Sequence, residues 1–281
     1  MRWVICALTA LTLASPVFAA DLGILPGPQP VAPGDSLPVG PATFTRWSGF
    51  YVGGQFGYTN GNAPFSTATP PGIGNALRET TLENEFNVSQ WPTLGTANQT
   101  VPSFGGFVGY NTQWQDVVIG IEANVSRAAF SLQAPSTPIG PLFLGADSLG
   151  LTHTVTISSS GSLSSNDFGT LRARAGYVFG NFMPYGFAGL ALTEATVSVA
   201  SNVHDIQCNS ATPPACGSFF YSNAYNANAQ ILYGLAVGGG VDWALTPNIF
   251  LRAEFEWDAF NAPPGLLYTL ATGRVGAGFK F

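Results

Sequence analysis

The strongest constraint on the fold of this chain is a repeated alternation of apolar residues with polar residues or glycine. It recurs from Trp47 to the last residue, in segments of about ten residues or slightly more. Successive side chains of a β-strand point to opposite faces, so each segment predicts a strand with one apolar and one polar face. No uninterrupted apolar run of about 18 residues follows the N-terminal twenty residues, which excludes a membrane-spanning helix there.

The alternating segments number eight, and the lengths of their connections follow a pattern. The segments are 47–58, 103–112, 117–130, 168–179, 183–197, 229–245, 249–260 and 266–281. Short turns follow the second, fourth and sixth segments, whereas long stretches follow the first, third and fifth. An even strand number with alternating short and long connections is typical of outer-membrane barrels, which have short periplasmic turns and longer external loops.

Composition separates a membrane barrel from a soluble one. Charged residues make up only 9% of the chain, against about 25% in typical soluble domains. The polar faces are rich in glycine and too sparsely charged for a solvated exterior, whereas a lipocalin-like barrel would expose its polar face to water. The fold class that we predict is all-β: an eight-stranded antiparallel transmembrane β-barrel with three long extracellular loops and short periplasmic turns.

The N-terminal segments predict export to the bacterial outer membrane. Residues 1–20 combine Arg2, an apolar stretch and small residues at Ala19 and Ala20, as a cleaved signal peptide does. A membrane anchor is the alternative, but the apolar stretch is too short to span a bilayer. Residues 21–43 are rich in Pro and Gly and predict an extended periplasmic linker, followed by the barrel at 44–281. We expect outer-membrane lipid and lipopolysaccharide as its surroundings.

Two cysteines remain after the predicted signal peptide. Cys208 and Cys216 stand in "CNSATPPAC". A close pair in an exported chain predicts a disulfide in a loop. Metal binding would need further Cys or His residues at ligand spacing, and only His204 is near, so we predict no metal site.

Charged side chains in the predicted strands fall on the face that would point into the barrel. The predicted lumen charge network comprises Glu122, Arg172, Arg174, Glu194, Asp242, Arg252, Glu254, Glu256, Asp258 and Arg274. An eight-stranded barrel is barely wide enough for its own side chains, and an isolated charge inside it would be costly. We therefore expect these groups to form ion pairs.

Strand pairing suggests which charges meet. If the last two hairpins turn about the prolines between their strands, Asp242 lies across from Arg252, and Arg274 reaches Glu254 and Glu256. Two hypotheses follow from such a network. It is either a structural plug or a gated ion path.

The sequence gives little support for catalysis or nucleic-acid binding. The two histidines, His153 and His204, fall in predicted loops, without an evident nucleophile and acidic partner. We predict no catalytic residues. The formal net charge of -6 argues against a nucleic-acid partner.

Several segments resemble the alphaproteobacterial porin-like outer-membrane proteins, which are built on the small OmpA/OmpX-type barrel and include surface antigens and hemin-binding proteins. The resemblance rests on "WSGFYVGGQFGY" (47–58), on 168–192 and 233–257, and on the terminal "RVGAGFKF". It implies a role in envelope integrity and surface interaction. It also implies heme capture in some members, for which His153, His204 or a loop tyrosine such as Tyr221 or Tyr225 would be the axial ligand. No other cofactor is expected.

The last strand carries a further implication of this resemblance. Its apolar side consists of Val275, Ala277, Phe279 and Phe281. A terminal aromatic strand of this kind is read by the outer-membrane barrel assembly machinery, which we therefore expect as a partner. The strand must also pair with 47–58, because an open edge is not tolerated in lipid. We expect a monomer.

Overall fold

The computed structural model describes residues 45–281, and the predictions for residues 1–20 and 21–43 lie outside these described residues. The helical elements lie between the first two strands. They are η1 (Phe65–Thr67), α1 (Thr69–Ala76), α2 (Thr81–Phe86) and η2 (Val88–Gln90). The strands are β1 (Gly49–Pro64), β2 (Thr96–Trp114), β3 (Val117–Gln133), β4 (Ile139–Ala146), β5 (Thr152–Tyr177), β6 (Phe182–Cys208), β7 (Cys216–Ala244), β8 (Ile249–Ala262) and β9 (Leu266–Lys280).

Eight of these strands close into an antiparallel ring, which confirms the predicted fold class. Neighbours follow the order β3-β2-β1-β9-β8-β7-β6-β5, and the β3–β5 pairing completes the ring. The last strand pairs with the first from Tyr51↔Lys280 to Asn62↔Thr269. β4 is a ninth strand outside the ring, and it pairs with the outer part of β5. No helix within residues 45–281 is long and apolar enough to cross a membrane.

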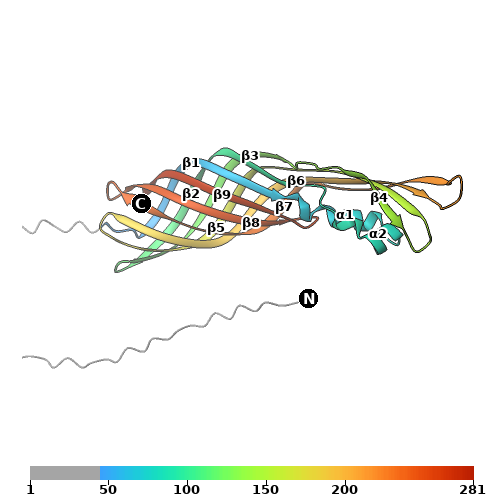
Figure 1. Ribbon diagram of the computed structural model, residues 1–281. Helices are drawn as coiled ribbons and strands as arrows, with labels where there is room; N and C mark the ends of the chain where they lie inside the picture. Colours follow the sequence, from blue (N-terminus) through green and yellow to red (C-terminus); the bar gives the residue numbers. More distant parts are fainter. Residues whose placement is uncertain (1–44) are drawn as a thin grey trace, which may run out of the picture. The chain divides into compact units, whose positions relative to one another are not determined.

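Three strands extend far past the ring toward the helices and β4 (Figure 1). β5, β6 and β7 have 26, 27 and 29 residues, whereas a membrane crossing needs about 9–11. The predicted external loops at 131–165 and 198–228 are therefore largely β-structure. The apolar–polar alternation is weak in these segments because uncharged residues alternate with the buried positions: threonine and serine flank Val155 and Ile157, and Asn202 and His204 flank Val203.

The helices of the first long connection cover one face of this extracellular extension. Ile73 and Leu77 of α1 and Leu82 of α2 are fully buried and form one apolar cluster with Val155 and Val203 of the sheet. Thr80 caps α2 by accepting a hydrogen bond from the Glu83 amide. Burial of a Leu or Ile side chain stabilises by about 1.5–3 kcal/mol, so these few contacts suffice to hold two short helices on the sheet.

Side chains of two further clusters fill the barrel itself. The periplasmic end holds an aromatic cluster that includes Trp47, Phe107 and Phe250. The extracellular half holds a second cluster, which includes Phe130, Phe168 and Phe260. The charged network lies between these two clusters along the strands, with apolar side chains on its periplasmic and its extracellular side.

Glycine makes room for these large inward side chains at two close approaches. A Cβ atom at Gly109 would overlap the hydroxyl of Tyr51, and one at Gly238 would overlap the ring of Phe187. The glycine-rich polar faces in the sequence therefore reflect lumen positions that have no space for a side chain.

Candidate functional site

The centre of the lumen holds an ion-pair network drawn from strands on opposite sides of the barrel. Its members are Arg172, Arg174, Arg252 and Arg274 with Glu122, Asp242, Glu254 and Glu256. All eight side chains are at most 2% exposed. The structure thus places eight of the ten predicted charged residues in one buried network.

Each arginine in this network binds more than one carboxylate. Arg172 contacts Glu122 and Glu256, and its Nη2 atom lies 2.8 Å from Glu254 Oε2. Arg252 donates from Nε to Asp242 Oδ1 at 2.9 Å and from Nη1 to both oxygens of Glu122. Because every guanidinium is shared, the network links β3, β5, β7, β8 and β9 across the lumen.

Two cross-strand pairs have the register that the sequence suggested. Asp242 is aligned with Arg252 between β7 and β8, and Glu254 is aligned with Arg274 between β8 and β9. Glu256 reaches Arg274 diagonally at 2.9 Å. The third aligned pair, Glu122 with Arg172, joins β3 to β5, the two strands that complete the ring.

Aromatic rings cover the guanidinium planes of this network. Arg174 lies 3.8 Å from the Tyr185 ring centroid, Arg172 lies 3.9 Å from Phe187, and Arg252 lies 4.0 Å from Phe107. Such contacts favour a desolvated cation over open water. Arg172, Arg174 and Arg252 therefore have carboxylates at their edges and aromatic rings on their faces.

The prediction for Glu194 is wrong, because its side chain lies on the outer face of β6. The buried positions of this strand include Tyr185, Phe187 and Ala195, so Glu194 is exposed. The sequence suggested the opposite facing because aromatic side chains were assigned to lipid. Tyr185 and Phe187 instead pack on arginines inside the barrel, and alternation then turns Glu194 outward.

Asp258 is buried in the lumen but does not join the network. It is fully buried, and within residues 45–281 neither of its carboxylate oxygens has a hydrogen-bond partner. Its cross-strand neighbours in the ladder are Ala236 and Leu270, which offer no polar group. The network therefore ends at Glu256, one inward position before Asp258.

A second buried polar cluster lies in the extracellular extension, around His153. The His153 ring is fully buried; Nδ1 lies 2.9 Å from Asp205 Oδ2 and Nε2 lies 3.2 Å from Asp147 Oδ2. The Phe86 ring of α2 packs edge-on against the imidazole at 5.8 Å between centroids. This Asp147–His153–Asp205 clasp joins the β4–β5 turn, β5 and β6 beneath the helices.

Backbone donors fix the turn that carries Asp147. Its Oδ1 atom accepts hydrogen bonds from the amides of Leu149 at 2.9 Å and Leu151 at 2.8 Å. The bond from Leu151 is the main reason why the pKa of Asp147 is lowered to about 2. Burial, with a smaller contribution from the Asp205 carboxylate, raises the pKa of the nearby Tyr221.

The clasp bears on the predicted role of His153 as a heme ligand and on the prediction that it is not catalytic. Both ring nitrogens face carboxylates and the ring is inaccessible, so His153 is not placed to ligate a heme iron. In an acid–histidine–serine arrangement, one ring nitrogen bonds to a carboxylate and the other to a hydroxyl nucleophile. Here both ring nitrogens of His153 face carboxylates. No cluster of His, Cys, Asp or Glu suited to a metal ion occurs among residues 45–281.

His204 has a different environment. It lies in β6 rather than in a loop, is half-buried, and stacks on the Phe220 ring at 4.2 Å. Its Nε2 atom lies 2.8 Å from Ser218 Oγ. The prediction that both histidines lie in loops is therefore wrong, since His153 also lies in a strand. Of the two, only His204 is open to a ligand.

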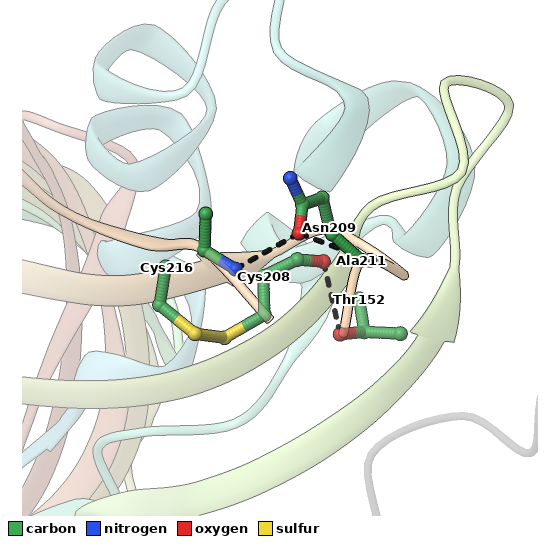
Figure 2. Close-up of a disulfide and its surroundings, with 6 residues drawn as sticks. Thr152, Cys208, Asn209, Ala211 and Cys216 are labelled. Carbon is green, nitrogen blue, oxygen red and sulfur yellow. Dashed lines mark hydrogen bonds between the residues drawn. A yellow bond between two sulfur atoms is a disulfide. The ribbon is translucent and has the colours of Figure 1, made fainter. Parts of the chain in front are cut away.

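The disulfide between Cys208 and Cys216 is present, as predicted from their spacing. It closes the tip of the β6–β7 hairpin, where the two residues are directly paired (Figure 2). Thr152 Oγ1 donates to the Cys208 carbonyl at 3.2 Å, which connects the tip to the start of β5. Asn209 accepts from the backbone of Ala211 and Ala215 within the closed turn.

The terminal strand presents two different faces at the periplasmic rim. Val275, Ala277, Phe279 and Phe281 are all exposed on the outer surface. Lys280 points inward, where it donates to the Arg46 carbonyl and lies 5.5 Å from the Trp47 ring. The role of the outer four residues as an assembly signal stays a prediction.

Comparison with known proteins agrees with this architecture. Residues 36–281 match the family described as the outer membrane protein beta-barrel domain. The chain belongs to this outer-membrane β-barrel family. Two relatives support the assignment over most of their lengths. The 25 kDa outer-membrane immunogenic protein of Brucella ovis is 24% identical, covering 99% of this chain and 96% of the relative. The 22 kDa outer membrane protein of Rhizobium leguminosarum bv. viciae is 26% identical, covering 86% and 75%.

Solved structures of outer-membrane barrels that match this chain have lower sequence identity to it. The match to Neisserial surface protein A covers 98% of that protein and 83% of this chain, at 15% identity and a TM-score of 0.38. Ail, the attachment invasion locus protein of Yersinia pestis, covers 99% and 83%, at 11% identity and a TM-score of 0.34. The family match and the geometry of the barrel therefore carry the assignment to the outer membrane.

Proposed function

We propose that this outer-membrane barrel is a structural protein with a closed lumen, which strengthens the envelope and presents a rigid surface outside the cell. The observation that carries the proposal is the shared ion-pair network, whose eight side chains are almost completely buried. An eight-stranded barrel has room for its own side chains and little more. Aromatic clusters lie on both sides of the network, so an ion would have to displace both the charges and the rings.

The same geometry argues against the alternative of a narrow channel. Opening a path would separate carboxylates from buried guanidiniums, and breaking a buried ion pair costs about 3–5 kcal/mol for each partner removed. Arg172 and Arg252 each bind at least two carboxylates, so one rotamer change does not clear the lumen.

Single-channel recording of the purified barrel in a planar bilayer tests the closed lumen. We expect no conductance steps above the background of the empty bilayer. An envelope role further predicts that a deletion strain is sensitive to detergent and that the wild-type gene restores resistance. Reproducible conductance steps would overturn the closed lumen, and an unchanged detergent sensitivity would overturn the envelope role.

We further propose that the protein is not an enzyme, because its one buried acid–histidine cluster is sealed from substrate and offers no nucleophile.

Heme binding is a second candidate function, and it rests on His204. The half-buried His204 ring stacks on the Phe220 ring, and its Nε2 atom is hydrogen-bonded to Ser218 Oγ. The other ring nitrogen, Nδ1, is the one that could ligate an iron. Hemin titration of wild type and His204→Ala tests it: an unchanged Soret shift in the variant would exclude ligation by this residue.

A further inference from the structure

The outer surface of the extracellular extension has a chemical order that follows distance from the membrane. Lipid-facing positions such as Ile121 and Val125 are apolar and strongly exposed. They are followed by a charged row, made of Arg127, Asp167 and Glu194 on β3, β5 and β6. Arg127 and Asp167 are directly aligned, and Glu194 lies opposite the bulge between Ser165 and Phe168 that contains Asp167. This row therefore marks the level at which hydrocarbon gives way to headgroups.

Beyond the charged row, the outward face of β3, β5, β6 and β7 has no Asp, Glu, Lys or Arg residue. Serine, threonine and asparagine predominate there, and they face away from the buried cluster beneath the helices. The exceptions include the stacked pair His204 and Phe220, which lies further out toward the tip of the β6–β7 hairpin. A solvated exterior normally mixes charges of both signs. An extended face of neutral hydroxyl and amide groups is unusual by comparison, and it implies a neutral polar environment.

A hollow of about 340 Å³ opens on this face. Its polar lining consists of Gln133, Ser136, Ser159, Ser160, Ser162 and Ser198. The volume lies within the range of small-molecule sites, about 300–1,000 Å³. Hydroxyl and amide side chains both donate and accept hydrogen bonds, as the hydroxyls of a sugar do. A phosphate would instead favour arginine or lysine, and the lining has neither.

The hollow arises from a gap in strand pairing. β3 pairs with β5 up to Gln133↔Ser162, and β4 takes over only at Ile139↔Ile157. Residues 158–161 of β5 thus have no ladder partner on that side within residues 45–281, although the Gly161 carbonyl accepts from Ala134 at 2.8 Å. A Cβ atom at Gly161 would collide with the Phe65 ring behind it, so backbone forms the floor of the hollow.

The height of the hollow above the charged row indicates which part of the membrane surrounds it. Gln133 lies six residues beyond Arg127 on β3. This separation is about 20 Å along the strand, or about 15 Å above the charged row at the usual barrel tilt. The face is continuous with the lipid-facing surface below it, so the outer-leaflet lipids that surround the barrel also surround the hollow. Glycolipids of the outer leaflet carry sugars at this level.

We propose that the serine-lined hollow binds a neutral sugar of the saccharide that outer-leaflet lipopolysaccharide carries above its lipid anchor. The hollow matches such a sugar in its height above the charged row, in its lack of charge, and in its lining of hydroxyl and amide groups, which both donate and accept hydrogen bonds. The proposal is independent of whether the lumen conducts ions. It assigns to the barrel a lateral glycolipid contact that begins where the hydrocarbon contact ends.

Accessibility of an introduced cysteine tests this proposal in the complete barrel. Ser160→Cys places a thiol in the hollow, and Thr96→Cys on β2 is the matched control at another exposed position of the outer rim. Each variant is reconstituted in phospholipid, in lipid A without further sugars, and in lipopolysaccharide with its core saccharide. The rate of labelling by a small uncharged maleimide is then measured in each membrane.

We expect the core saccharide to slow labelling at Ser160→Cys by about tenfold relative to lipid A, as occupancy at about ten times the dissociation constant would do. The control should change much less. Equal slowing at both positions would indicate general crowding by sugars and would overturn the proposal, as would no slowing at all. Slowing by soluble neutral oligosaccharide without lipopolysaccharide would overturn the choice of membrane glycolipid as the source.

A second experiment leaves Ser160 unchanged, because its replacement by cysteine could itself weaken sugar binding. Ser162→Asp with Ser198→Asp introduces charge at one exposed and one half-buried position of the lining and retains the hydrophilic surface. In lipopolysaccharide with core sugars, wild-type barrel should gain thermal stability over the lipid A membrane, and the double variant should lose that gain. The same gain in the double variant would overturn the proposed contact.

Discussion

Removal of the Arg252 guanidinium is the sharpest test of the buried network. Its side chain is fully buried and bonds to Asp242 at 2.9 and 3.2 Å and to Glu122 at 2.9 and 3.0 Å. Arg252→Met keeps a side chain of similar length but leaves Asp242 with Arg174 as its remaining cation. Removing one partner of a buried pair costs about 3–5 kcal/mol, and we expect the free energy of unfolding to fall by this amount.

The assay is reversible urea unfolding of the refolded barrel in phospholipid vesicles, followed by tryptophan fluorescence. Gel mobility of unboiled samples shows that each variant has folded before it is measured. Arg127→Met is the matched control, since Arg127 is exposed on the outer face and should cost about 0.5 kcal/mol or less. Arg252→Lys keeps the charge but loses the planar fork, so it should fall between wild type and Arg252→Met.

A double variant separates lost pairing from lost packing. Arg252→Met with Asp242→Leu removes opposite charges together, and replacing a buried ion pair by apolar residues is often nearly neutral. We therefore expect the double variant to recover at least half of the stability lost in Arg252→Met. If Arg252→Met folds and its unfolding free energy lies within about 1 kcal/mol of wild type, the network does not stabilise the barrel as argued.

Three further predictions concern other parts of the barrel. Deleting Phe281 should lower assembly into the outer membrane in cells more than it lowers the stability of refolded protein; normal insertion of the truncated chain would refute this. Because the pKa of Asp147 is depressed to about 2, its stabilising bonds are present above the unfolded value near 4 and lost as the pH falls toward 2. The protection factor of the Leu151 amide, which corrects for intrinsic exchange at each pH, should therefore fall over that range in wild type but not in Asp147→Asn. Reduction of the Cys208–Cys216 disulfide should raise amide exchange at the hairpin tip without changing the melting temperature of the barrel, because the tip lies outside the ring; a large drop in melting temperature would contradict this.

The barrel itself could be predicted because lipid imposes a strict rule on each strand. Positions such as Val117, Ile119 and Ile121 must all be apolar, and the residues between them must fit a narrow interior. A period of two residues therefore stands out in the sequence. The same rule, together with short turns, set the Asp242–Arg252 and Glu254–Arg274 pairs correctly.

Outside the membrane this rule ends, and prediction weakened there for a physical reason. On the outward faces of the extensions of β5, β6 and β7, serine, threonine and asparagine stand in place of the apolar residues that mark a strand in lipid. The helices could not be foreseen as a cap because their apolar side chains have no partner until β5 and β6 bring Val155, Ile157 and Val203 together.

The sequence by itself determined the class of fold, the export route that it predicts and the residues available to fill the lumen. Only the tertiary structure decided which way β6 faces, because Tyr185 and Phe187 satisfy lipid and arginine equally well until Arg172 and Arg174 are placed beside them. It also decided the partners of His153, which come from Asp147 and Asp205 in separate strands or turns. Local alternation records which solvent a face meets, whereas pairing across a closed ring depends on register and curvature that no short segment carries.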